Sequence, residues 1–277
     1  MQIVKGTVAV ITGAGGGIGR CLATALAAKG CNLALVDIND DALNETLAAV
    51  SEYGVKTTLH NTDITNFEAV EALAAEVLAK QAKVNILINN AGITIQKSFE
   101  THSIDDWNRV LGINLMGVIH GCKAFLPALK ESAKLDGAHI VNMSSMAGLL
   151  GLPNQASYSS SKAAVRAISE SLHAEHLVDN IGVTSVHPGA IKTKMILATL
   201  HESDDLESAE KSYKMVEKIG NSPGYAAKRI VRAIEKRSIR IRIGKDAVIL
   251  DILKRFFPNS LSNLVSRLTA KSKQKAN

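Results

Sequence analysis

Tyr158 and Lys162 are the residues of this sequence whose types and spacing most directly indicate chemistry. They stand four apart in a segment of helical character, so both side chains lie on one face, one turn from each other. A positive charge beside a phenol favours the phenolate and is expected to lower the tyrosine pKa from about 10. Ser145, thirteen residues before Tyr158, follows an apolar run and can offer its hydroxyl to the same substrate oxygen. The three residues together predict a site of proton transfer to or from oxygen.

A glycine-rich turn near the start of the chain is the second element that indicates function. The apolar residues 8–12 are followed by G-A-G-G-G-I-G at residues 13–19 and then by a helical pattern. Glycines let the backbone approach a ligand closely, and the N-terminus of a helix attracts phosphate. A glycine-rich turn alone is a weak signal and is often only a tight connection. Strand, glycine turn and helix in this order are the context in which the turn binds a dinucleotide.

The identity of the dinucleotide is predicted from Asp37, at the end of a second strand over residues 32–37. A carboxylate about twenty residues beyond the glycine turn can accept hydrogen bonds from the adenosine ribose and repels a 2′-phosphate. A neighbour, Asn39 or Asp40, is better placed to cap the next helix, and no Arg or Lys nearby would attract the extra phosphate. The sequence therefore predicts NAD rather than NADP.

Strand and helix patterns alternate along the rest of the chain. Further strands are expected at residues 55–60, 137–143, 182–187 and 239–244, and a strand with a small-residue turn at 84–92. Helices are expected at about 40–53, 66–81, 104–131 and 224–236, and the helix that carries Tyr158 and Lys162 continues to about 178. The composition, with 46% apolar and only 4% aromatic residues, suits a sheet covered on both faces by helices. We therefore predict an α/β fold: a Rossmann-type, doubly wound, mostly parallel seven-stranded sheet, with ligands at the carboxyl ends of the strands.

The residues expected to reach the dinucleotide lie where these strands end. Asp63 could face the adenine amino group, with a turn aspartate as the alternative, and Thr193 could hydrogen-bond a carboxamide or phosphate. Asn114 lies in an apolar helical pattern, so its amide must find partners, by holding a water or relaxing a bend. The predicted cofactor-binding residues are Thr12, Gly13, Gly15, Gly17, Ile18, Gly19, Asp37, Asp63, Ile64, Asn90, Ala91, Gly92, Tyr158, Lys162, Pro188, Gly189, Ile191 and Thr193.

Taken together, T-G-A-G-G-G-I-G, N-N-A-G, Asn114, S-S-M-A-G, Y-S-S-S-K and P-G-A-I-K-T resemble the short-chain dehydrogenase/reductase family. The resemblance covers residues 5–244 and implies a catalytic tetrad of Asn114, Ser145, Tyr158 and Lys162. It implies that Tyr158 is the acid or base, that Lys162 lowers its pKa and binds the nicotinamide ribose, and that Ser145 holds the reacting oxygen. It further implies that Asn114 orders a water linking Lys162 to solvent, and that the protein is a homodimer or homotetramer.

The predicted function is hydride transfer between NAD(H) and a secondary alcohol or ketone on a largely apolar body. The long insertion at residues 194–224 follows the ligand-binding edge and is expected to form a lid. A non-catalytic NAD-binding scaffold or sensor with the same fold is the alternative, against which the intact tetrad argues. Candidate substrate walls in the lid, with ordinary packing as the rival interpretation, are Met195, Ile196, Leu197, Leu200, Leu206, Met215 and Val216.

The net charge of +6 has an uneven distribution. Residues 228–277 hold fourteen Lys and Arg against three Asp and Glu, so the basic excess belongs to the C-terminal part. We expect residues 1–245 to form the NAD-binding catalytic domain and residues 246–277 a basic amphipathic extension. Docking of this extension on the body is favoured over contact with another subunit or a membrane surface, and no nucleic-acid partner is predicted.

Three further features bear on compartment and metals. The three cysteines have no metal-ligand spacing, and His173 and His176 lack a zinc signature, so no metal site is predicted. The first residues have no signal-peptide pattern, and no apolar run reaches the length of a membrane span. We expect a cytoplasmic protein with a small-molecule substrate.

Overall fold

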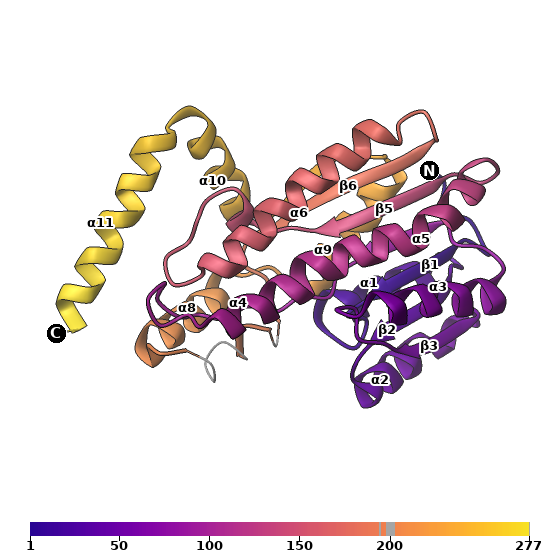
Figure 1. Cartoon of the computed structure of the whole chain (residues 1–277), viewed down its shortest axis with the longest axis horizontal. Coiled ribbons are helices and arrows are strands. Elements are labelled where there is room, and N and C mark those ends of the chain that lie inside the picture. The colour runs from indigo at the N-terminus through magenta and orange to yellow at the C-terminus, as the bar shows by residue number, and fades with distance from the viewer. Residues whose placement is uncertain (194, 198–202, 277) are drawn as a thin grey trace.

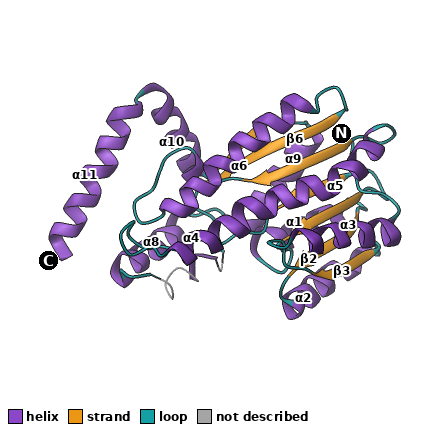
Figure 2. Ribbon diagram, in the orientation of Figure 1, coloured by secondary structure: helices purple, strands orange, loops and turns teal. Residues whose placement is uncertain are grey.

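The protein, seen as a computed structural model that describes residues 1–193, 195–197 and 203–276, is built on one sheet (Figures 1 and 2). Every pair of neighbouring strands is parallel, in the order β3-β2-β1-β4-β5-β6-β7. The strands are β1 (Val8–Thr12), β2 (Asn32–Asp37), β3 (Thr57–Asn61), β4 (Ile86–Asn89), β5 (Ala138–Met143), β6 (Ile181–Pro188) and β7 (Arg240–Ile243). The predicted Rossmann-type sheet is confirmed, and the order reverses between β1 and β4, where such folds bind their ligands.

Helices cover both faces of this sheet (Figure 1). The helices of the described residues are α1 (Gly17–Ala27), α2 (Asp40–Val50), α3 (Phe67–Gln81), α4 (Ile104–Leu111), α5 (Gly117–Ala133), α6 (Ala156–Glu175), α8 (Leu206–Ile219), α9 (Pro223–Glu235), α10 (Lys245–Phe256) and α11 (Pro258–Ala276). Ala9 and Ile11 of β1 pack with α1, α2 and α9, whereas Val10 packs with α3 and α5 on the other face. All three are fully buried, which is why the strands read as unbroken apolar runs.

The start of α1 differs from the starts of α2, α3, α4 and α9. Asn39, Asn66, Ser103 and Ser222 accept hydrogen bonds from backbone N–H groups in the first turns of α2, α3, α4 and α9, respectively. At the start of α1 stands Gly16, which has no side chain to cap the helix, and no acidic residue follows in the first turn. The N-terminus of α1 is therefore left to bind an anion.

The predicted helix at residues 104–131 consists of α4 and α5 joined by a π-helical turn, η2 (Gly112–Met116). The run Ile104–Ala133 is long and apolar enough to cross a membrane by length and composition, but 44% of its most apolar window is buried. Asn114 and His120 are buried within it, and α5 packs against α3, β4 and β5. This is a helix of the protein core.

Of the two C-terminal helices, α10 packs against β7 and α11 leaves the body of the molecule. Asp251 of α10 is buried and pairs with Arg240 and Arg242 of β7, at 2.6 and 2.7 Å, so the two arginines lie on one face of the strand. Beyond α10 the chain turns, and α11 projects away from the sheet (Figures 1 and 2). The favoured expectation that the whole extension docks on the body is therefore wrong for α11, which packs on α10.

Candidate active site

The glycine turn lies between β1 and α1, against the end of β4. Gly13 has a φ of +64°, and a Cβ there would lie 2.8 Å from the Cα of Ala91. A Cβ on Gly19 would lie 2.0 Å from the carbonyl oxygen of Gly13. Neither position can hold a side chain, because the backbone segments are in direct contact.

Two polar side chains fix the shape of this turn. Thr12 Oγ1 accepts hydrogen bonds from the backbone N–H groups of Asn90 and Ala91, at 3.0 and 3.1 Å. Asn90 Nδ2 donates to the carbonyl oxygens of Thr12 and Gly13, each at 3.0 Å. The ends of β1 and β4 are thereby joined, and Thr12 acts by holding the turn in place.

Asp37 ends β2 beside the same turn. Its Oδ2 accepts a hydrogen bond from the N–H of Gly15 at 2.9 Å, and its Oδ1 accepts one from the N–H of Asn39 at 3.2 Å. A Cβ on Gly15 would lie 2.9 Å from the carboxylate and 2.7 Å from the Cβ of Ala42, so residue 15 must be glycine. The backbone holds the carboxylate at the cleft, where sequence reasoning placed it.

Tyr158 and Lys162 lie one turn apart on α6, with Lys162 Nζ 5.7 Å from the centre of the tyrosine ring. The ammonium donates to the carbonyl oxygen of Met143 at 2.9 Å, and burial lowers the pKa of Lys162 to about 8. Burial raises the pKa of Tyr158, and a hydrogen bond with the Ser145 side chain acts in the opposite direction. In the protein without a bound cofactor, burial is the larger of these two effects, so the pKa of Tyr158 is raised and not lowered as expected.

Two adjacent serines follow β5 and have different partners. Ser144 Oγ donates to the carbonyl oxygen of Lys162 at 2.7 Å and so fixes the backbone of α6. Ser145 begins the short turn η3 (Met146–Gly148), and its Oγ accepts from the N–H of Ala147 at 3.1 Å. Ser145 is the one whose side chain interacts with Tyr158 and lowers its pKa, and its catalytic role stays a prediction.

Asn114 is fully buried in η2. Its Oδ1 accepts from the N–H of Ile93 at 2.8 Å, and its Nδ2 donates to Ile93 O at 2.9 Å and to Ser161 Oγ at 3.2 Å. A Cβ on Gly92 would lie 3.1 Å from Asn114 Oδ1 and 3.3 Å from Lys162 Nζ. The amide thus joins the bend in the helix to the loop after β4 and to α6, beside the lysine.

These residues meet in a cavity of about 770 Å³ at the carboxyl ends of the strands. The predicted residues that line it are Gly13, Gly17, Ile18, Asp37, Asn90, Ala91, Gly92, Ser145, Tyr158, Lys162, Pro188, Gly189, Ile191 and Thr193. Thr12, Gly15, Gly19 and Asn114 lie behind this lining and support it. One cleft therefore contains both the dinucleotide turn and the proton-transfer residues.

Asp63 and Ile64 lie away from the lining. Asp63 Oδ1 accepts hydrogen bonds from the N–H and Oγ1 of Thr65, at 2.9 and 2.8 Å, as a turn aspartate does. Ile64 is buried, and a Cβ on Gly117 would lie 2.4 Å from its Cδ1. Asp63 thus makes the hydrogen bonds of a turn residue, its contact with adenine stays a prediction, and Ile64 packs in the core against α5.

The lid insertion contributes to the cleft in part. Met195, Ile196, Met215 and Val216 line the cavity as predicted, joined by Ile219. Leu197 and Leu206 are exposed, and Leu200 lies outside the described residues. The described part of the lid thus supplies apolar walls, mainly from α8.

Several lining residues were not found by sequence reasoning. Asp246, at the start of α10, accepts a hydrogen bond from the N–H of Ala190 at 2.7 Å, and Arg109, Gln96 and Gln155 also face the cavity. Asp246 and Ala190 are 56 residues apart, so no local pattern connects them. The only sequence signal for Asp246 was a carboxylate in the first turn of a helix, next to the edge of the sheet that is predicted to bind the nucleotide.

His187 is another residue whose role was missed. Its Nδ1 lies 3.1 Å from the carbonyl oxygen of Ser145, and its Nε2 lies 3.0 Å from Ser185 Oγ. Burial lowers the pKa of His187 to about 4, so the ring is neutral at pH 7. The neutral ring donates through Nδ1 to Ser145, because a carbonyl oxygen can only accept, and this holds the serine next to Tyr158.

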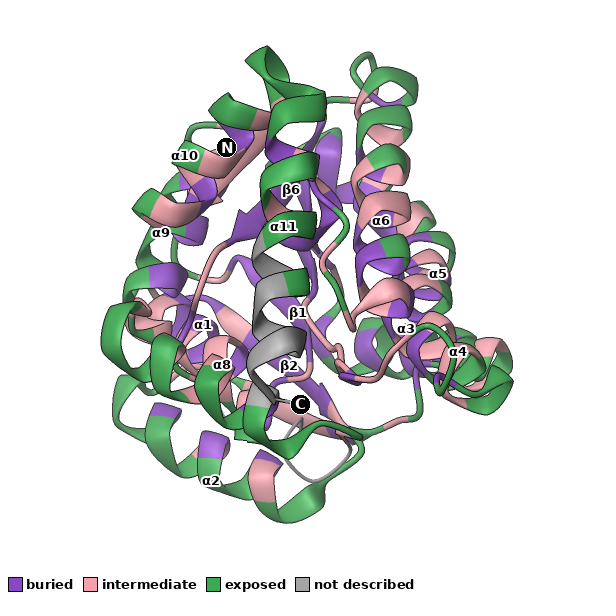
Figure 3. Cartoon of the chain, turned by 90° about the vertical axis from the view of Figure 1, so that its left-hand side faces the viewer, coloured by how far each residue is buried: buried purple, intermediate pink, exposed green. Residues whose placement is uncertain are grey.

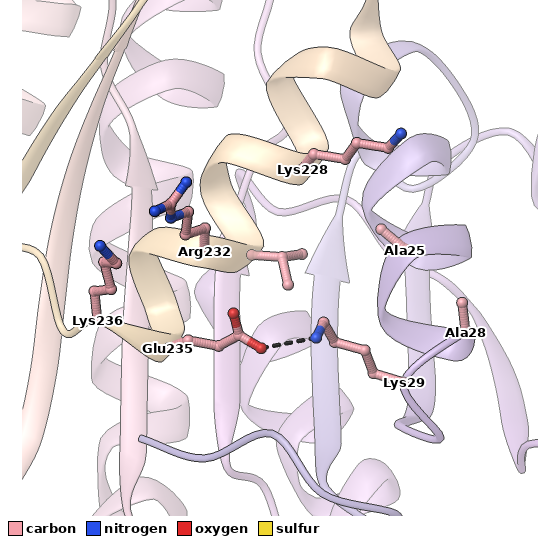
Figure 4. A pocket seen from close by; sticks show the side chains of 8 residues that line it. Ala25, Ala28, Lys29, Lys228, Arg232, Glu235 and Lys236 are labelled. Carbon is pink, nitrogen blue, oxygen red and sulfur yellow. Dashed lines mark ion pairs between the residues drawn. The ribbon is translucent and has the colours of Figure 1, made fainter.

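A separate hollow of about 610 Å³ lies between α1 and α9 (Figure 4). Lys29 and Glu235 form an ion pair across it at 2.8 Å, and Lys228, Arg232 and Lys236 line it. Such exposed charges contribute little binding free energy. The hollow contains none of the predicted site residues and is separate from the reaction cleft.

A parallel sheet whose order reverses at a glycine turn, with a buried lysine and a tyrosine in the same cleft, defines a Rossmann-type nucleotide-binding enzyme. A family model described as short chain dehydrogenase matches residues 7–203. The chain belongs to this family and is an oxidoreductase of the short-chain dehydrogenase/reductase type.

Known relatives agree with this assignment. The chain is 38% identical over 274 residues to an oxidoreductase of Mycobacterium tuberculosis (strain H37Rv) named SadH, covering 98% of each chain. It is 36% identical over 194 residues to the trans-4-hydroxycyclohexanecarboxylate dehydrogenase of Sinomonas cyclohexanicum, covering 68% of this chain and 73% of the relative. A crystal structure of a short-chain dehydrogenase/reductase from Burkholderia phymatum in complex with NAD matches with a TM-score of 0.83, at 30% identity, over 92% and 95% of the two chains.

Proposed function

We propose that this oxidoreductase transfers a hydride between NAD(H) and a secondary alcohol or ketone on a largely apolar body. The observation that carries the proposal is the convergence of Ser145, Tyr158 and Lys162 with the glycine turn and Asp37 in one cleft. A proton donor or acceptor and a dinucleotide turn are the two parts that hydride transfer at a carbon–oxygen bond requires.

NAD is the cofactor that this cleft fits. The uncapped N-terminus of α1 and the bare backbone of Gly17 suit a pyrophosphate, and the carboxylate of Asp37 suits the two ribose hydroxyls of an adenosine. Lys162, Asn90 and Gly92 lie on the side where the nicotinamide ribose would be held. When bound, NAD supplies the acceptor or donor of the hydride and, in its oxidised form, a positive ring.

Tyr158 takes the proton of a substrate hydroxyl or gives one to a carbonyl. Burial raises the pKa of Tyr158, so its neutral phenol is favoured until positive charge is near. Lys162 provides that charge from the next turn, and Ser145 donates a hydrogen bond to the reacting oxygen. Ser144 donates a hydrogen bond to the backbone carbonyl of Lys162 and so keeps Lys162 in position. His187 does the same for Ser145 through the backbone carbonyl of Ser145.

The apolar walls of the cavity support the proposed substrate class. Met146, Leu152, Ile196, Met215 and Val216 lie around the open part of the cleft. The relative from Sinomonas is named for a secondary alcohol on a cyclohexane ring. We therefore propose a substrate in which the hydroxyl-bearing carbon is attached to a hydrocarbon body.

The test is a panel of secondary alcohols and ketones of graded chain length, read by NADH absorbance. Tyr158→Phe should abolish turnover while NADH binding, followed by fluorescence, survives. Tyr225→Phe makes the same chemical change on an exposed face of α9 and should leave turnover unchanged. Full activity in Tyr158→Phe would refute the mechanism, and NADH binding with no turnover of any panel member would favour the scaffold or sensor.

We also propose that the protein forms a homodimer or homotetramer, as its family membership leads us to expect. The long helices α5 and α6 cover the same face of the sheet and are the helices on which we expect the subunits to meet (Figure 1). Light scattering after size-exclusion chromatography measures the mass directly, and a monomer at micromolar concentration would contradict this proposal.

A further inference from the structure

The outer face of α10 carries a continuous row of exposed apolar side chains. Ile249, Ile252, Leu253 and Phe256 follow the i, i+3, i+4, i+7 spacing of one helix face. The row continues onto the turn and α11. We call this set the extension stripe; its members and exposed fractions are Ile249 56%, Ile252 45%, Leu253 38%, Phe256 74%, Phe257 57% and Leu264 53%.

The inner face of α10 explains why the stripe points outward. Asp251 is 3% exposed and pairs with Arg240, Arg242 and Arg255. Burial alone would raise the pKa of Asp251, but the three guanidinium groups hold it below its ordinary value, so the carboxylate remains charged. A charged pair at the inner face fixes the rotation of α10. An ordinary docked helix turns its apolar side to the core. α10 instead turns its apolar side away from the core.

The acidic residues of the extension are engaged within the protein, so the charge that the extension offers to a partner is positive. Its two acidic residues are both engaged, Asp246 with the N–H of Ala190 and Asp251 with the arginines. Residues 252–277 contain six Lys and Arg and no Asp or Glu. Exposed apolar side chains in a segment of net positive charge fit an apolar surface that carries negative charge.

We propose that the extension stripe docks on the surface of an anionic lipid bilayer. A second copy of the chain at this surface would bring the same positive charges together, which charge repulsion opposes. Contiguous exposed apolar side chains on a soluble domain mark an interaction site, and anionic headgroups attract Lys and Arg near the membrane surface. The apolar ring and alkyl groups would enter the headgroup boundary while the lysines and arginines meet the phosphates.

The docked end of the molecule is also the end that holds the reaction cleft. α8 of the lid, α10 and α11 lie together at one end of the sheet (Figure 1), and α11 passes in front of the strand ends in the view of Figure 3. A membrane at this end would lie next to the lid. If the substrate is apolar, as proposed above, it would reach the cleft directly from the bilayer; docking itself does not depend on that step.

The experiment is co-sedimentation of the full chain with vesicles of phosphatidylcholine alone or mixed equally with phosphatidylglycerol. We expect binding to the mixed vesicles, weaker binding to phosphatidylcholine, and a steep loss with added salt. Phe256→Ser with Phe257→Ser should reduce partitioning at least about tenfold, because two aromatic side chains no longer enter the boundary. Arg267→Gln should reduce binding only to the mixed vesicles.

Leu135→Ser is the matched control, since Leu135 is 87% exposed in the turn between α5 and β5. It should bind vesicles as the unchanged chain does. Circular dichroism and melting curves establish that each variant is folded. Absence of binding to mixed vesicles, or equal binding by the double variant, would overturn the proposal. A double variant that changes only the oligomeric mass would assign the stripe to a second copy and overturn it as well. Because the readout is binding, the result is independent of turnover.

Discussion

Removing the carboxylate of Asp246 should convert Gly189→Ala from a damaging substitution into a tolerated one. A Cβ on Gly189 would lie 2.1 Å from Asp246 Oδ2 and 2.3 Å from both Cγ and Oδ1, and these are its three nearest atoms. The same carboxylate accepts the hydrogen bond from Ala190 at 2.7 Å. One group thus excludes a side chain at residue 189 and holds the loop that lines the cofactor cleft.

The expected magnitudes follow from these contacts. Gly189→Ala alone overpacks the loop and should cost about 1–3 kcal/mol of unfolding free energy. Asp246→Ala alone removes a hydrogen bond to a charged acceptor and should cost about 1.5–3 kcal/mol. In the double variant the clash is absent, so its total cost should be close to that of Asp246→Ala. The coupling between the two sites should therefore be about 1–3 kcal/mol.

Urea unfolding of the unchanged chain, the two single variants and the double variant measures this coupling. NADH titration by fluorescence measures how far the same substitutions change cofactor binding in the cleft. Asp246→Asn is the matched control, because an amide oxygen can still accept from Ala190 but still collides with an alanine at residue 189. Gly189→Ala should remain damaging in that background. Costs that simply add in the Gly189→Ala/Asp246→Ala variant would refute the reasoning.

Three further predictions concern the cleft. Asp37→Ser should lower the preference for NAD over NADP in kcat/KM, by removing the repulsion of a 2′-phosphate; unchanged discrimination would reject this role. Ser145→Ala should abolish turnover with little change in Tm. Ser144→Ala removes the hydrogen bond to the Lys162 carbonyl, so its main effect should be a lower Tm. A lower Tm in Ser145→Ala together with lost turnover at unchanged Tm in Ser144→Ala would contradict both assignments. Because the folded-state pKa of His187 is lowered to about 4, its contribution to stability is complete above the unfolded pKa near 6.5 and is lost as pH falls toward 4. The contribution of His187 to the slope should reach about 1.4 kcal/mol per pH unit, and His187→Gln should remove that part from unfolding curves between pH 7 and 4, leaving the part due to His139, whose pKa burial lowers to about 3.

Much of the fold and of the site could be predicted from the sequence, because each sequence pattern that indicates them spans only a few residues. The strand, glycine turn and helix around Gly13 are contiguous, and so is the four-residue interval from Tyr158 to Lys162. Asp37 predicts the cofactor because the strand that carries it ends at the residue that the hydrophobic pattern indicates. In each case the backbone geometry needed for function is encoded within a few residues.

The sequence by itself determined the α/β sheet, the glycine turn and the one-turn spacing of Tyr158 and Lys162. Only the tertiary structure decided which distant groups support them: His187 meets Ser145 across 42 residues, and Asp246 meets Ala190 across 56. It also decided the direction of the Tyr158 pKa shift, because burial depends on every element around the cleft. The outward turn of α10 follows from Asp251 pairing with β7, a contact between two elements. Local patterns specify elements, whereas contacts and desolvation arise only when the elements pack.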